Sequence, residues 1–109
     1  MSTAESAPFG LREDELSRIQ SVLQAHRNVN QAIIYGSRAM GTHRAGSDID
    51  ITLRGNLDRT ECQQIETELD NLDLPYKIDL SHEPQIENQT LLAHIHQHGQ
   101  TLYKKQTNE

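Results

Sequence analysis

Apolar residues recur at helical spacing in three stretches of the chain. Their spacing of three and four residues predicts helices over residues 12–27 and 59–72, and a last helix that ends at Gly99. Asp58, with Glu61 three residues further on, has the pattern of a capping box and marks the start of the second helix. The apolar positions that define these helices are Leu16, Ile19, Leu23, Cys62, Ile65, Leu69, Leu72, Ile86, Leu91, Leu92 and Ile95.

Short apolar runs lie between these helices and predict strands at residues 32–35, 48–53 and 76–80, with a short closing strand at 101–103. Helices and strands then follow one another in the order α-β-β-α-β-α-β. This order predicts an α/β (α+β) fold class, with a small mixed sheet flanked by helices.

Two carboxylates two residues apart begin the second predicted strand. Because strand side chains alternate between faces, Asp48, Asp50 and Thr52 point one way while the isoleucines between them point into a core. Asp79 lies on the polar side of the third predicted strand. We therefore expect the carboxylates to gather at one exposed spot, where their mutual repulsion favours a bound divalent cation with oxygen ligands.

The loop between the first two strands adds groups suited to phosphate. Gly36 lets the backbone approach a phosphate closely, and Ser37 offers a hydroxyl beside the N–H groups of the turn. Arg38 and Arg44 could neutralise a triphosphate, and Ser47 ends the same loop. Carboxylates that hold two magnesium ions against a nucleoside triphosphate would support nucleotidyl transfer, with Asp79 as the candidate base.

The bulk composition fits one small domain, which we expect over residues 11–104 between flexible tails at 1–10 and 105–109. A net charge of −6 and 4% aromatic residues do not favour direct nucleic-acid binding. The single cysteine, Cys62, excludes an intramolecular disulfide framework. No apolar run is long enough to span a membrane, and the N-terminus lacks the apolar core of a secretion signal, so we expect a cytoplasmic protein.

Taken together, the Gly36-Ser37 turn, ten intervening residues, the Asp48-Ile49-Asp50 pair and the later Asp79 resemble the signature of the polymerase-beta-like nucleotidyltransferase superfamily. The short length and the Tyr35-Gly36-Ser37-Arg38-Ala39 turn are similar to the stand-alone minimal nucleotidyltransferases (MNT). Members of that group commonly act as the antitoxin beside a HEPN-domain toxin. The resemblance extends from about Leu11 to Lys104.

The resemblance implies specific roles for these residues. Asp48, Asp50 and Asp79 would be catalytic and would hold Mg²⁺, and Ser37 would help to bind the triphosphate of ATP. AMP would be transferred to a hydroxyl, in some members a tyrosine of the HEPN toxin. We expect acceptor recognition to come from that partner, encoded adjacently, or from a second copy of the chain, which would make a hetero-oligomer or a homodimer.

Two other functions stay open at this point. The chain could neutralise its partner by binding alone, with the acidic site as a nucleotide sensor or a relic. It could also be a small-molecule nucleotidyltransferase, for which the absence of an acceptor-binding domain gives no support.

Several residues near the predicted site have a structural interpretation. His94, His96 and His98 are interpreted as a solvated helix end because no third metal ligand accompanies them at a suitable spacing. His43 is either near a ligand or an exposed loop residue. Cys62 falls on an apolar stripe and is interpreted as core, and Tyr35 as packing.

Overall fold

The computed structural model describes residues 8–106. The helices are α1 (Glu13–Gln24), α2 (Ser37–Met40), α3 (Arg59–Asp70) and α4 (Gln89–His98), and two 3-10 turns are η2 (Pro8–Gly10) and η3 (Glu83–Gln85). The strands are β1 (Val29–Tyr35), β2 (Ile49–Gly55), β3 (Ile78–His82) and β4 (Gln100–Lys104). Of the expected tails at 1–10 and 105–109, residues 1–7 and 107–109 lie outside the described residues, and the domain bounds stay a prediction.

The strands form one mixed sheet in the order β3-β2-β1-β4. β1 pairs antiparallel with both β2 and β4, whereas β3 pairs parallel with β2. The parallel pair needs a crossover connection, and α3 supplies it. This architecture confirms the predicted fold class, a small mixed sheet flanked by helices.

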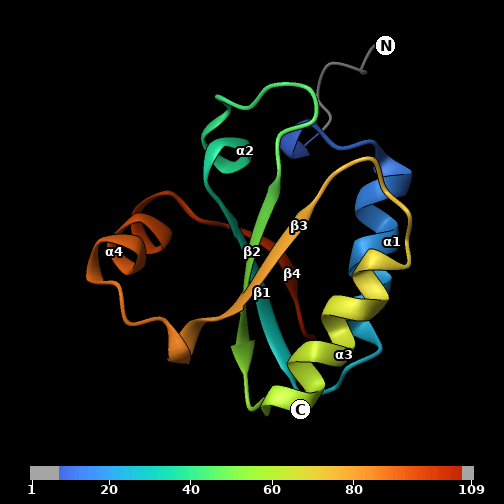
Figure 1. Ribbon diagram of the computed structural model, residues 1–109, viewed down its shortest axis with the longest axis vertical. Coiled ribbons are helices and arrows are strands. Elements are labelled where there is room, and N and C mark those ends of the chain that lie inside the picture. Colours follow the sequence, from blue (N-terminus) through green and yellow to red (C-terminus); the bar gives the residue numbers. More distant parts are fainter. Residues whose placement is uncertain (1–7, 107–109) are drawn as a thin grey trace.

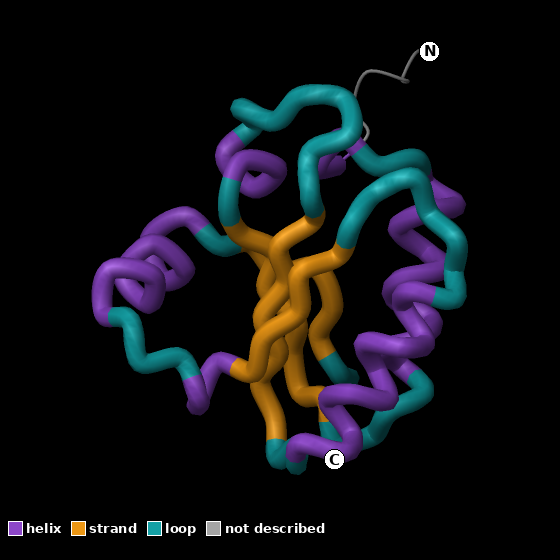
Figure 2. The backbone as a smooth tube through the Cα atoms, in the orientation of Figure 1, coloured by secondary structure: helices purple, strands orange, loops and turns teal. Residues whose placement is uncertain are grey.

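Helices cover both faces of the sheet. Figure 1 shows α1 and α3 side by side on one face and α4 on the other, and the strands form the central layer in Figure 2. The larger core cluster lies under α1 and α3, where the side chains of Ile49, Ile51 and Leu53 are fully buried. A smaller cluster on the opposite face joins Ile33 and Tyr35 to α4.

Local sequence signals explain where the helices begin. The Asp58 side chain accepts a hydrogen bond from the Glu61 N–H at 2.8 Å, so the predicted cap of α3 is confirmed. At the start of α1 the roles are reversed, because the carboxylate of Glu15 in the first turn accepts from the N–H of the N-cap residue Arg12 at 2.9 Å. Gly99 ends α4, as its position in the sequence predicted.

The polar face of β2 differs from the prediction. Asp50 is half-buried and Thr52 is fully buried, so only the start of the strand is open. The expected exposed spot therefore includes Asp48 and Asp79, which are exposed, but Asp50 is half-buried because η3 packs on β2 and α4 packs on β1 on this face of the sheet. The second strand, predicted at 48–53, spans Ile49–Gly55, so its predicted end was two residues too early.

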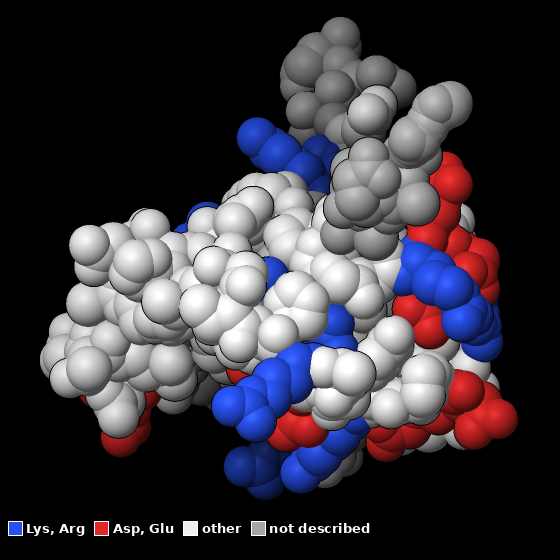
Figure 3. Space-filling view, turned by 90° about the horizontal axis from the view of Figure 1, so that it is seen from above, with Lys and Arg blue, Asp and Glu red and all other residues white. Residues whose placement is uncertain are grey.

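Charged side chains are distributed unevenly over the end of the molecule where the loops gather. Figure 3 views this end, and it shows charges of both signs over the α1 side and few over the α4 side. The sequence of α4 contains glutamine and histidine but no aspartate, glutamate, lysine or arginine. Within residues 8–106, no helix has the length and apolar character needed to cross a membrane.

Candidate active site

The turn that follows β1 has a backbone conformation that only glycine adopts readily. Gly36 has φ 79° and ψ −155°, and a Cβ at this position would lie 2.4 Å from Oδ2 of Asp50. The backbone of the turn therefore lies directly against a carboxylate of β2. Ser37 then begins the short helix α2, and among the described residues its hydroxyl makes no hydrogen bond.

The sheet places one tyrosine and two aspartates in a row across three strands. Tyr35 of β1 pairs with Asp50 of β2, and Asp50 pairs with Asp79 of β3. Paired positions of neighbouring strands project their side chains from the same face. Asp48 lies two residues before Asp50 and is exposed. The structure thus brings the sequence-predicted acids to one end of the sheet.

The electrostatics of this row follow from its crowded negative charge. Burial raises the pKa of Asp50, and the charges of Asp79 and Asp48 raise it further, while His94 acts in the opposite direction. Burial also raises the pKa of the Tyr35 phenol, to which Asp50 and Asp79 contribute. Within residues 8–106, none of the three carboxylates forms an ion pair, so their charge is not neutralised by the protein.

The donor set at this end suits a hard divalent cation. Unpaired carboxylates offer the oxygen ligands that Mg²⁺ prefers, and a cation would relieve the repulsion from Asp79 and Asp48 that adds to burial in raising the pKa of Asp50. No three His, Cys, Asp or Glu side chains of the described residues already converge to the spacing of a metal site. The residues therefore fit the ion in chemistry, and the assignment of Asp48, Asp50 and Asp79 as ligands stays a prediction.

Arg38 does not lie in the row formed by Tyr35, Asp50 and Asp79. Its side chain is only 3% exposed, and its guanidinium donates to the carbonyls of Phe9 (2.8 Å) and Ser47 (2.9 and 3.1 Å). The same group lies 4.5 Å from the ring centre of Tyr76. Arg38 thus fixes the carbonyl of the residue before Asp48, and its predicted contact with a triphosphate stays untested.

The other loop residues predicted at the site form a turn of their own. The Arg44 N–H donates to the Ser47 hydroxyl at 2.9 Å, and the Ser47 N–H donates back to the Arg44 carbonyl. The exposed Arg44 and the half-buried His43 line a hollow of about 460 Å³ with Tyr76. Of the two interpretations of His43, the exposed loop residue does not agree with its half-buried side chain.

His94 is a site residue that the sequence interpretation missed. Its Nε2 accepts a hydrogen bond from the Gly36 N–H at 3.1 Å, and its ring meets Tyr35 edge-on with centroids 6.1 Å apart. The prediction of a solvated helix end is correct for His96 and His98, which are exposed, but wrong for His94. No periodicity in the sequence indicates that α4 packs over the Gly36 turn.

Tyr35 and Cys62 were the two residues that the sequence placed in packing positions. Tyr35 is buried and packs with Ile33 and Ile95, which confirms its packing role. Cys62 packs against the main core but is only half-buried. Burial raises the pKa of its thiol, with smaller contributions from Asp58 and Glu61, so the protonated form is favoured.

A known protein family matches most of the chain. The family described as Polymerase beta, Nucleotidyltransferase matches residues 17–108. The chain therefore belongs to the polymerase beta nucleotidyltransferase family. None of the curated proteins matches the chain significantly.

Solved structures with the same fold include toxin–antitoxin complexes. One, a toxin–antitoxin with AMP-PNP, has a TM-score of 0.64 and 22% identity over 88% of this chain and 76% of that chain. Another, a tri-AMPylated HEPN toxin with MNT antitoxin from Shewanella oneidensis, has a TM-score of 0.64 and 18% identity over 87% and 74%. A third, the toxin–antitoxin MntA-HepT, has a TM-score of 0.63 and 18% identity over 86% and 74%. These likenesses show a shared fold.

Proposed function

We propose that this chain is an antitoxin-type nucleotidyltransferase that transfers AMP from ATP to a hydroxyl of a HEPN-domain toxin and so neutralises it. The row of Asp50 and Asp79 beside the Gly36 turn is the observation on which the proposal depends. Membership of the polymerase beta nucleotidyltransferase family supports the type of reaction. The similar structures of a complex with AMP-PNP and of an AMPylated toxin support the nucleotide and the partner.

Each group of the site has a part in this proposal. Gly36 lets the turn approach the triphosphate closely, the Ser37 hydroxyl binds it, and Arg44, exposed on the same loop, is proposed to neutralise it. Asp48, Asp50 and Asp79 would hold Mg²⁺, which when bound would offset the negative charge of the phosphates. Arg38 acts as a positioning residue through the carbonyl of Ser47.

The proposed step is a substitution at the α-phosphorus of ATP. The acceptor oxygen forms a bond to this phosphorus, and the bond from phosphorus to the oxygen that bridges to the β-phosphate breaks. Pyrophosphate leaves with that electron pair, and the hydroxyl proton passes to the carboxylate of Asp79 and then to solvent. The products are the AMP ester of the acceptor, pyrophosphate and one proton.

The test is transfer of label from α-labelled ATP to the adjacently encoded HEPN protein in the presence of magnesium. The wild type is compared with Asp48→Asn, and Asp70→Asn on the exposed end of α3 serves as the matched control. We expect transfer by Asp48→Asn to fall by about a hundredfold or more, because a carboxylate that stabilises the reacting charge is lost. The control should transfer at the rate of the wild type.

Undiminished transfer by Asp48→Asn would contradict the assignment of the site. A stable complex of wild type and HEPN protein without any label on either protein would contradict transfer itself and favour neutralisation by binding alone.

A further inference from the structure

One edge of the sheet is open next to the acidic row. β3 is an outer strand, and it pairs only with β2. The Ile49 N–H donates to the Lys77 carbonyl, so the parallel ladder uses residues 77, 79 and 81 of this segment. By this alternation the N–H and C=O of Leu80 point away from β2, and among residues 8–106 they have no hydrogen-bond partner. The edge therefore offers free backbone groups to another strand.

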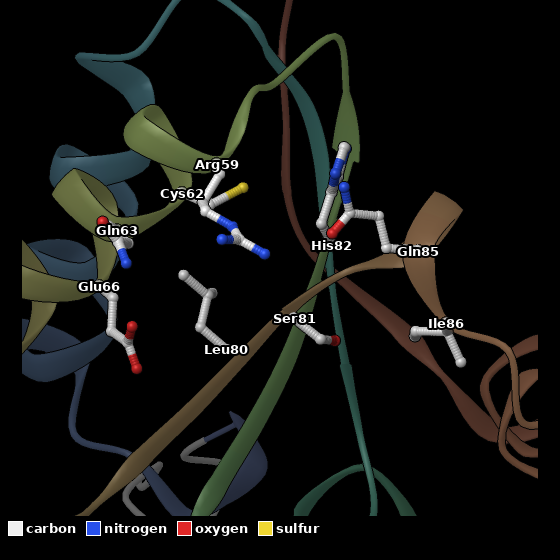
Figure 4. Close-up of a pocket in the computed structure, with 9 residues that line it drawn as sticks. All are labelled: Arg59, Cys62, Gln63, Glu66, Leu80, Ser81, His82, Gln85 and Ile86. Atoms are coloured by element: carbon white, nitrogen blue, oxygen red, sulfur yellow. The ribbon is translucent and has the colours of Figure 1, made fainter.

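A groove runs along this edge. It has a volume of about 280 Å³, with α3 on one side and the segment after β3 on the other. Figure 4 shows Leu80 pointing toward α3 and Ser81 on the opposite side of β3, toward Ile86. The Ser81 hydroxyl is buried on that side. A groove with a wall on each side of an open strand edge has the shape that an extended peptide fills.

The opposite edge of the sheet is less available. β4 forms that edge, and the Leu102 carbonyl already accepts a hydrogen bond from the Gln20 side chain at 2.9 Å. β4 is also separated from Asp79 by the two central strands. The β3 edge is therefore the sheet edge that lies next to Asp79.

The row of site residues has a direction across the sheet. Gly36 and Ser37 follow β1, Asp50 lies on β2 and Asp79 lies on β3. The groups proposed to bind the triphosphate are thus at the inner end of the row, and the proposed base is at the outer edge. A strand added beside β3 would lie about 4.8 Å away and would place one side chain next to Asp79 on the same face.

The charges of the groove and of the whole chain indicate which charge a bound peptide segment would carry. The α3 wall carries Glu66, and the net charge of the chain is −6. Arg59 is the single cation of the groove within the described residues. Because Glu66 and Asp79 are both negative, a segment with a basic side chain opposite Glu66 is favoured over an acidic segment or a nucleic-acid backbone.

We infer that the acceptor protein docks an extended segment as an additional strand on β3, with a hydroxyl side chain beside Asp79 and a basic side chain facing Glu66. This inference rests on the proposed function and specifies how its acceptor binds. The sheet would then have five strands in the order acceptor-β3-β2-β1-β4, with the reacting hydroxyl at the end of the row.

The first test is amide exchange by NMR on the wild type, free and in complex with the adjacently encoded HEPN protein. An added strand would bond to the Leu80 N–H and slow its exchange by about tenfold or more. The Asp79 N–H serves as an internal control, because it already lies in the ladder with β2. Exchange at Leu80 that is unchanged by a bound partner would overturn the inference.

The second test is the kinetics of AMP transfer by Glu66→Lys and Asp70→Lys, which make the same charge change on α3 inside and outside the groove. We expect Glu66→Lys to raise KM for the acceptor protein by about fivefold, with kcat and KM for ATP unchanged, and Asp70→Lys to match the wild type. Equal KM values for the two variants would overturn the inference.

The two tests separate this inference from the proposed function. Transfer of AMP with an unprotected Leu80 amide would agree with the proposed function but contradict the added strand. A protected Leu80 amide without transfer of AMP would support the added strand but contradict the proposed reaction. Neither transfer nor protection would overturn both.

Discussion

Gly36 is the residue on which the site depends most at the atomic scale. Its φ of 79° and ψ of −155° lie in a region that side chains do not tolerate, and Asp50 occupies the space of a Cβ. Its N–H also donates to His94. One glycine therefore connects the turn after β1, a carboxylate of β2 and a ring of α4.

Gly36→Ala should therefore cost more stability than Gly41→Ala. Gly41 also has a φ of 79° but nothing lies within 4 Å of its Cβ position, so alanine there should cost about 1 kcal/mol from backbone strain alone. At Gly36 the contact with Asp50 adds to the strain, and we expect about 3 kcal/mol. Urea unfolding measures both, and equal losses would contradict this account of the turn.

The positions of some site residues could be predicted from the sequence, and the contacts of others could not. Asp48, Asp50 and Asp79 could be predicted to gather, because spacing along a strand decides which face a side chain takes. The contact of His94 with Gly36 could not, since it joins residues 58 positions apart through the packing of α4. The buried position of Arg38 depends in the same way on a loop and a segment distant in the sequence.

At the scale of elements, helices with a strong apolar stripe and a cap could be predicted best. The α3 prediction of 59–72 agrees closely with Arg59–Asp70 because Asp58 fixes its start. The strands were harder, because they are short and their ends depend on pairing: the third strand was predicted at 76–80 but spans Ile78–His82. The short helix α2 was not predicted, since four residues give no periodicity.

A histidine in the turn after α1 is held between two carboxylates of α3. Nδ1 of His26 lies 3.0 Å from Glu61, and Nε2 lies 2.8 Å from Glu68. Burial lowers the pKa of His26, but the hydrogen bonds to Glu68 and Glu61 raise it by more, and the net pKa is raised above 6.5. Because both ring nitrogens face carboxylates, the doubly protonated ring is favoured in the folded state.

This contact predicts a pH dependence of the free energy of unfolding. A group with a raised folded pKa contributes stability that is fully present below the unfolded pKa and is lost as pH rises through the folded pKa. We expect the wild type to lose stability from about pH 6 to about pH 9, and His26→Gln to lose less over the same range. Urea unfolding of both proteins at the two pH values measures this, and equal losses would contradict the ion pair.

At the scale of the whole molecule, the fold arranges the proposed site across one end of a sheet. The antiparallel pair β1-β2 brings the Gly36 turn to Asp50, and the parallel pair β2-β3 adds Asp79 at the edge. The chain belongs to the polymerase beta nucleotidyltransferase family, and it shares its fold with the solved toxin–antitoxin structures. The central claim is that this end of the sheet transfers AMP to a partner protein.

The most direct measurement of that claim is the intact mass of the proposed partner, a HEPN protein encoded next to this chain, after incubation with this chain, ATP and magnesium. The account predicts a gain of whole AMP units with the wild type, no gain with Asp79→Asn, and no gain when a chelator removes the metal. An unchanged mass with the wild type, or an equal gain with Asp79→Asn, would contradict it.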